Sequence, residues 1–108
     1  MEIVSESRLI RRATVDDADL ISVLSTHVWV HTYAESGVSR AIAEYLLREL
    51  GPTKWVSRIA AAETDVLVVE QSGRLVGVSV LKYQSTFADV HVELETLYVL
   101  PSHARSGT

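Results

Sequence analysis

Apolar residues in the first half of the chain recur with the three- and four-residue spacing of helices. The first series predicts a helix that begins near Thr14, because Thr14 and Asp17 have the spacing of a capping box. A second helix is predicted between Ser39, which can cap it, and Gly51-Pro52, which ends it. The predicted apolar faces are Leu20, Ile21, Leu24 and Val28 in the first helix, Ile42, Tyr45, Leu46 and Leu50 in the second, and Trp55, Val56 and Ile59 in a short third helix.

The second half of the chain has the runs of apolar residues that are typical of strands. Residues 65–71 contain an uninterrupted apolar run at 66–69, which is typical of a strand covered on both faces. Ser72-Gly73 predicts a two-residue turn into a partner strand over 74–83, and the last strand is predicted from Val90 to Val99. With a short first strand over 8–12, this order predicts an α+β fold, in which two or three helices pack on a mainly antiparallel sheet of about four strands.

Composition and charge narrow the class of protein. The 108 residues are 47% hydrophobic, which fits one domain over 1–108. The net charge of −4 disfavours a nucleic-acid partner. There is no cysteine, so disulfides and thiolate chemistry are excluded and a cytoplasmic location is expected. No apolar run approaches the roughly 20 residues that span a bilayer, so no membrane partner is expected.

The last predicted strand carries ionisable side chains at alternate positions. Strict alternation places His91, Glu93 and Glu95 on one face. It places Val90, Val92, Leu94 and Thr96 on the other face. Two interpretations of the ionisable face remain open. One of its side chains acts as a general base with the others as partners, or the face is a polar surface exposed to solvent. Glu93 lies nearer the middle of the strand, so we expect it to be the more shielded carboxylate and the better candidate for a base.

Two further features of the helices carry a structural interpretation. His27 and His31 stand four residues apart, which permits a shared metal ion, but the sequence offers no third ligand and no HExxH pattern. We therefore predict that no metal is bound. Trp29 and Trp55 are expected to pack in the core or between helices rather than to form a cofactor platform.

A glycine-containing segment, Arg105-Ser-Gly-Thr108, follows the last strand and Pro101. Backbone N–H groups in such a loop can hold phosphate when a helix follows with its positive end toward the anion. Many surface turns have a similar composition, so the signal depends on the position of the segment directly after a strand.

Taken together, these residues resemble the GNAT family of acetyl-CoA-dependent N-acetyltransferases. The resemblance covers most of the chain and includes LIRRATVDD at 9–17 and RLVGVSV at 74–80. It is most specific in ELETLYVLP at 93–101, because the fourth strand of the family typically reads ELxxLYVxP. That strand leads into Gln/Arg-x-x-Gly-x-Gly/Ala. Gly107 matches the first glycine of this motif, whereas Ala104 stands where Gln or Arg is usual.

The resemblance implies a role for each matching position. Acetyl-CoA would be the co-substrate, and the acceptor would be a primary amine on a small molecule or peptide. The pantetheine arm and the acetyl carbonyl would lie against the backbone of Leu97 and Val99, with Tyr98 between them, where the family's strand bulges. Glu93 would deprotonate the amine. The N–H groups of Arg105, Ser106, Gly107 and Thr108 would begin the pyrophosphate site.

In this family the loop runs into a helix and a fifth strand that completes the cofactor slot. The chain therefore resembles the N-terminal half of an acetyltransferase, truncated after Thr108, and we expect it to have little activity alone. The alternative is a non-catalytic interaction module. Its open fourth strand would pair with a second copy of the chain, as a homodimer, or with another protein. An unrelated α+β domain with an accidental match is a third interpretation.

Overall fold

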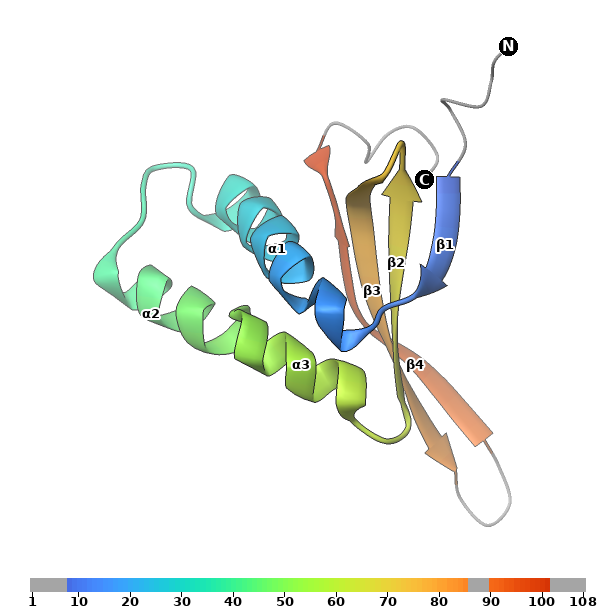
Figure 1. The fold of residues 1–108 in the computed structure, drawn as a ribbon. Coiled ribbons are helices and arrows are strands. Elements are labelled where there is room, and N and C mark those ends of the chain that lie inside the picture. The colour runs from blue at the N-terminus through green and yellow to red at the C-terminus, as the bar shows by residue number, and fades with distance from the viewer. Residues whose placement is uncertain (1–7, 86–89, 102–108) are drawn as a thin grey trace.

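The computed structural model describes residues 8–85 and 90–101, which form a four-stranded sheet with helices on one face (Figure 1). The strands are β1 (Arg8–Arg12), β2 (Thr64–Gln71), β3 (Arg74–Ser85) and β4 (Val90–Val99). The helices are the 3-10 turn η2 (Val15–Asp17), α1 (Ala18–Tyr33), α2 (Arg40–Glu49) and α3 (Pro52–Ala60). Neighbouring strands pair antiparallel in the order β1-β2-β3-β4, which confirms the predicted α+β fold. None of the helices described is long and apolar enough to cross a membrane.

The first helical segment begins at an ion-pair network that joins it to the sheet. The predicted capping box of Thr14 and Asp17 is present, and the Thr14 N–H donates to Asp17 Oδ2 at 2.7 Å. Arg11 of β1 donates two hydrogen bonds to the Asp17 carboxylate, at 2.8 and 3.0 Å, and a third to Glu70 of β2 at 2.7 Å. The Arg11 guanidinium holds the pKa of Asp17 at about 2. Arg11 therefore ties β1, β2 and the start of the helical region together.

The hydrophobic core lies between the helices and one face of the sheet. Its largest fully buried apolar side chains are Trp55, Ile21, Val68, Val78 and Val80. The Trp55 indole N–H donates to Ser25 Oγ at 3.2 Å, so the buried polar group of α3 has a partner on α1. Most of the predicted helix faces are confirmed, but Leu20, Tyr45 and Val56 are exposed. For these three residues the prediction is wrong, because the buried stripe of each helix is narrower than the apolar series in the sequence.

The turn between β2 and β3 has the predicted geometry. Ser72 and Gly73 both have positive φ, at 55° and 77°. Two consecutive residues of this conformation form the type I′ turn, whose twist matches that of antiparallel strands. Glycine reaches this region without steric cost, so Gly73 suits the turn, after which Arg74 pairs with Gln71 and Leu75 with Glu70.

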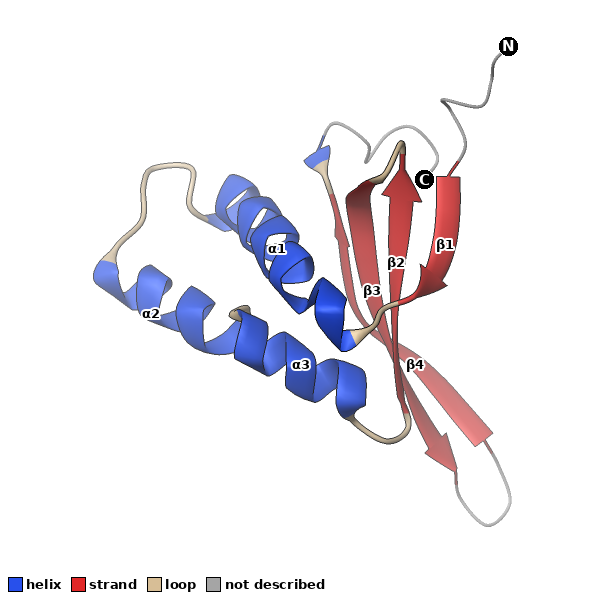
Figure 2. Cartoon of the chain, viewed as in Figure 1, coloured by secondary structure: helices blue, strands red, loops and turns tan. Residues whose placement is uncertain are grey.

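The helices cover only one face of the described sheet (Figure 2). Residues that pair directly across neighbouring strands lie on the same face of the sheet. The residues that pair with positions outside the core therefore lie on the face turned away from the helices. That side, here called the outer face, carries Ile10, Leu67, Val69, Leu81, Val92, Leu94 and Leu97. Ile10 is 66% exposed and Leu97 is 60% exposed. The prediction that β2 is covered on both faces is therefore wrong for the described residues.

Replacing Asp17 with Asn is expected to lower the free energy of unfolding by about 1–2 kcal/mol at pH 7, because the amide loses its charge toward Arg11 and part of the cap. Urea unfolding followed by circular dichroism measures the change. Asp19→Asn, in the exposed first turn of α1, is the matched control and should change stability by less than about 0.5 kcal/mol.

The difference between the unaltered protein and Asp17→Asn should depend on pH. The folded pKa of Asp17 is about 2, below its ordinary value of 3.8. The stabilising contribution of the carboxylate is therefore complete above about pH 4 and is lost as the pH falls through about 2. Equal stability of the two proteins at pH 7, or a gap that widens on acidification, would contradict the assigned role of the Arg11–Asp17 pair.

Candidate functional site

An irregularity in the pairing of β3 with β4 decides which β4 side chains face the helices. Val80 pairs with Thr96, but the next residue, Leu81, pairs with Leu94, so Glu95 is an extra residue in β4. A bulge of this kind interrupts the alternation of side chains. Val80 is buried beneath the helices, so Thr96 lies on that face, whereas Leu94 lies on the outer face. The strict alternation predicted for this strand is therefore wrong across Glu95.

The backbone after the bulge presents hydrogen-bonding groups at the edge of the described sheet. No other described strand pairs with β4 on the side away from β3. The Leu100 N–H donates to the Val76 carbonyl at 3.0 Å. Because the hydrogen-bonding direction alternates along an antiparallel strand, the N–H and C=O groups of Leu97 and Val99 point away from β3. These groups form what is here called the open edge of β4.

Tyr98, between those two residues, lies on the helix-bearing side. It pairs with the buried Val78 and packs against the core. Burial raises the pKa of Tyr98, the nearby phenols of Tyr45 and Tyr33 raise it further, and Arg58 opposes them. Trp29 packs against Tyr33 and Tyr45, with ring centroids 5.0 and 5.5 Å apart. The helix-packing role predicted for Trp29 is confirmed.

A cavity of about 340 Å³ lies between α3 and the β3–β4 hairpin, beside the bulge, and is here called the α3–β4 cavity. Its charged lining residues are Lys54, Arg58, Lys82 and Glu95. Lys82 Nζ lies 3.4 Å from Glu95 Oε2, so Glu95 is on the helix-bearing side of the sheet. The bulge therefore brings a carboxylate of β4 into the same cavity as the cations of α3 and β3.

Arg58 is the most constrained cation of this cavity. Its guanidinium carbon lies 4.6 Å from the centroid of the buried Trp55 ring, a cation–π distance. Its Nη2 lies 3.8 Å from Glu49 Oε1, which is longer than a hydrogen bond. Its Nη1 is shielded from solvent and has no hydrogen-bond partner among the described residues. A buried donor without a partner is costly, so this arrangement of Arg58 does not add to the stability of the fold.

Glu93, the predicted catalytic base, is exposed to solvent in the structure. Glu93 pairs with Lys82 and shares the helix-bearing side with it, but Glu93 is exposed. The end of β3 and the start of β4 project past the helices (Figure 1). Glu95 is exposed as well, so the expectation that Glu93 is the more shielded of the two carboxylates stays a prediction, as does its role as a base.

The predicted pyrophosphate residues Arg105, Ser106, Gly107 and Thr108 lie outside the described residues, as does the side chain of His91. Sequence reasoning did not identify the cations of the α3–β4 cavity. Lys54 and Arg58 stand four residues apart, the spacing of neighbours on one helix face, which was an available signal. Lys82 had no such signal, because its contact with Glu95 depends on the bulge.

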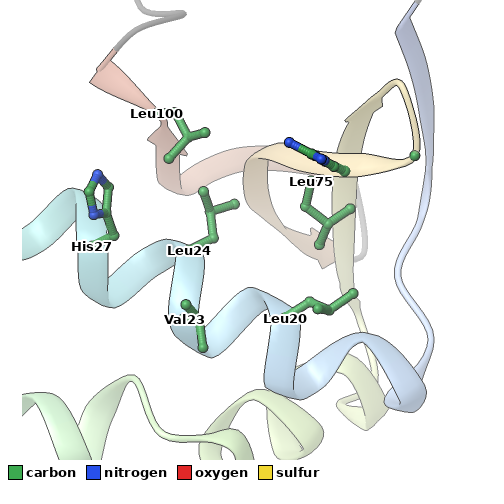
Figure 3. Close-up of a pocket in the computed structure, with 8 residues that line it drawn as sticks. Leu20, Val23, Leu24, His27, Leu75 and Leu100 are labelled. Carbon is green, nitrogen blue, oxygen red and sulfur yellow. The ribbon is translucent and has the colours of Figure 1, made fainter.

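A second, mainly apolar cavity of about 470 Å³ lies between α1 and the turn that joins β2 to β3 (Figure 3). Leu20, Val23 and Leu75 line it, and the imidazole of His27 lies at one end. In residues 8–85 and 90–101 no group of three His, Cys, Asp or Glu side chains could hold a metal ion. The absence of metal at His27 and His31 stays a prediction.

Comparison with known proteins places the fold. The sequence matches no protein-family model and none of the curated proteins. Among solved structures, the PaiA N-acetyltransferase of Thermoplasma acidophilum in complex with coenzyme A matches with a TM-score of 0.77 and 20% identity over 92% of this chain. The ribosomal-protein-alanine N-acetyltransferase of Brucella melitensis biovar Abortus 2308 gives 0.68 and 12% over 94%, and a GCN5-related N-acetyltransferase of Ralstonia eutropha JMP134 gives 0.62 and 21% over 94%.

The chain spans 62%, 63% and 67% of the lengths of these three proteins, respectively. The described part therefore has the fold of the N-terminal portion of GNAT N-acetyltransferases, which confirms the fold that the sequence resemblance implied. At identities of 12–21% the likeness concerns the fold.

Proposed function

We propose that this chain supplies the acetyl-CoA-binding strand of an N-acetyltransferase whose acceptor is a primary amine of a small molecule or peptide. The observation that carries the proposal is the open edge of β4, where Leu97 and Val99 present backbone groups just after the bulge at Glu95. An unpaired strand edge binds extended ligands through backbone hydrogen bonds. The pantetheine arm is an extended chain with two amides, and a protein of this fold has been solved with coenzyme A.

The proposed reaction is direct transfer. The neutral amine attacks the thioester carbonyl, an N–C bond forms, the C–S bond breaks and coenzyme A leaves as a thiolate. An N–H group of the open edge stabilises the developing oxyanion, and holding both reactants against β4 lowers the entropic part of the barrier. We assign Glu93 the role of accepting the amine proton, since it shares the helix-bearing side with the α3–β4 cavity.

The solved proteins of this fold are longer than the part that this chain matches. We therefore propose the complete activity for this chain together with a polypeptide that supplies the rest of the fold. The open edge alone provides a few backbone contacts, which must offset the entropy lost on binding. Weak binding of acetyl-CoA and little turnover are expected from the 108 residues by themselves.

Weak binding at the open edge is measurable by titrating ¹⁵N-labelled protein with acetyl-CoA to about 5 mM. This range detects dissociation constants near about 1 mM, which correspond to a binding free energy of about −4 kcal/mol. The amide signals of Leu97 and Val99 should shift in a saturable manner. Val99→Pro removes an N–H that faces away from β3, so the saturable shifts should be lost. The strand itself should persist, because proline is tolerated on an edge strand. Val99→Ala keeps the N–H and should bind like the unaltered chain.

ADP serves as a probe with phosphates and adenine but no pantetheine. Absence of shifts at Leu97 and Val99 with acetyl-CoA, or equal shifts with ADP, would refute the proposed role of the open edge. Equal binding by Val99→Pro and Val99→Ala would show that the backbone donor is not used.

A non-catalytic interaction module is the second candidate, and the outer face favours it. Val92 and Leu94, near the start of β4, are 52% and 55% exposed and adjoin the open edge. An apolar face next to an unpaired strand is a common site of association. We propose a second copy of this chain as the occupant.

Sedimentation equilibrium distinguishes this candidate. The unaltered chain should form dimers at about 100 μM, whereas Val92→Lys/Leu94→Lys should remain monomeric, because lysine on an edge strand opposes pairing. Val23→Lys, an exposed apolar position on α1, is the control and should not affect dimerisation. A strictly monomeric unaltered chain at that concentration would exclude self-association through the outer face.

A further inference from the structure

The α3–β4 cavity concentrates positive charge in an acidic protein. Three of its lining residues are cations and one is a carboxylate, whereas the whole chain has a net charge of −4. The ion pairs of these cations are long: 3.9 Å for Lys54 with Glu49, 3.8 Å for Arg58 with Glu49, and 3.4 Å for Lys82 with Glu95. The contacts of Arg11 with its two carboxylates are 2.6–3.0 Å. The cations of the cavity therefore keep donors that their carboxylate neighbours do not satisfy.

Folding stability does not explain this arrangement. Ion pairs between partly exposed side chains contribute about 0–1 kcal/mol, and less when their geometry is poor. Three cations drawn toward one concave surface also repel one another. The unsatisfied Nη1 of Arg58 adds a desolvation cost, although stacking on Trp55 fixes the guanidinium in place. A rigid guanidinium flanked by two flexible ammonium groups is the arrangement that recognises carboxylate and phosphate.

We propose that the α3–β4 cavity binds the anionic group, carboxylate or phosphate, of a small amine, and that this amine is the acetyl acceptor. Only the identification of the ligand as acceptor rests on the proposed function. Glu95 lies in the same cavity and offers a carboxylate to the ammonium end of the ligand. A volume of about 340 Å³ suits a small molecule.

The position of the cavity supports the assignment to an acceptor. Glu95 is the bulge residue, and Leu97, two residues further along β4, belongs to the open edge proposed to hold the thioester. An anion held by Arg58 and Lys82 would leave the amine end of a short ligand beside the bulge. The acceptor class is therefore a short amine that carries a carboxylate or a phosphate, rather than a simple alkylamine or a polyamine.

Four probes of similar length separate the contributions. They are 4-aminobutyrate (amine and carboxylate), O-phosphoethanolamine (amine and phosphate), butylamine (amine only) and butyrate (carboxylate only). Each is titrated into the ¹⁵N-labelled 108-residue chain at low salt without acetyl-CoA. The indole N–H signal of Trp55, beneath Arg58, and the amide signals of Lys82 and Glu95 are the readout. At least one of the two bifunctional probes should bind at least tenfold more tightly than butylamine and butyrate, and their order identifies the anion.

The double variant Lys54→Gln/Lys82→Gln tests the cations without disturbing the core, since the two side chains are 45% and 50% exposed. It should weaken binding of the better probe at least tenfold. Arg40→Gln, an exposed cation at the start of α2, is the matched control and should leave binding unchanged. The four probes are compared on the unaltered chain, so their relative affinities remain interpretable even if a variant is less stable.

Equal binding of butylamine and the bifunctional probes, no saturable shift with any probe, or unchanged binding by the double variant would overturn the proposal. Equal binding of butyrate and 4-aminobutyrate would overturn the claim that the ligand is an amine. Failure of acetyl-CoA to shift Leu97 and Val99 is a separate result that concerns the proposed function alone, because the two titrations report on different residues and different ligands.

Discussion

Burial of Trp55 is the interaction on which the core and the candidate site both depend. The residue has no exposed surface, its indole N–H reaches Ser25 on α1, and Arg58 stacks on its ring. Helix α3 has only nine residues, too few to be stable by itself, so tertiary contacts must hold it against the sheet. Trp55 is the largest fully buried side chain among the described residues. Its packing helps to hold α3 in place, and Lys54 and Arg58 are carried on that helix.

The bulge at Glu95 is the second constraint, and it separates two chemical environments on one strand. Before and at the bulge, Glu93 and Glu95 share the helix-bearing side with Lys82. After it, Leu97 turns its side chain to the outer face and its backbone groups to the open edge. A regular strand would have kept Leu94 and Thr96 on the same face. The extra residue allows one strand to present a carboxylate, Glu95, to the cavity and backbone groups to the open edge.

Local features of the fold could be predicted from the sequence, because they depend on residues close together in the chain. The capping box of Thr14 and Asp17, the cap at Ser39 and the turn at Ser72-Gly73 belong to this class. The limits of β4 were also predictable, since its apolar and β-branched residues end at a proline. The bulge was not predictable from alternation, because it is defined by the partners of β4 in β3. The cavity was missed for the same reason: Arg58 and Lys82 meet only through the packing of α3 against the hairpin.

The apolar side chains of the outer face have a physical consequence that connects both candidate functions. Helices cover one side of the described sheet, whereas about half a dozen apolar side chains on the outer face are partly exposed. Covering them would contribute on the order of 5 kcal/mol, taking about 1 kcal/mol for each half-exposed side chain. That is comparable to the whole stability of many small domains. A polypeptide that covers the outer face would therefore stabilise the fold as it binds, by the same linkage that applies to any ligand of the folded state. The outer face must be covered whether that polypeptide completes an acetyltransferase or is a second copy of the chain. Association through this face and folding of the sheet are therefore expected to be coupled.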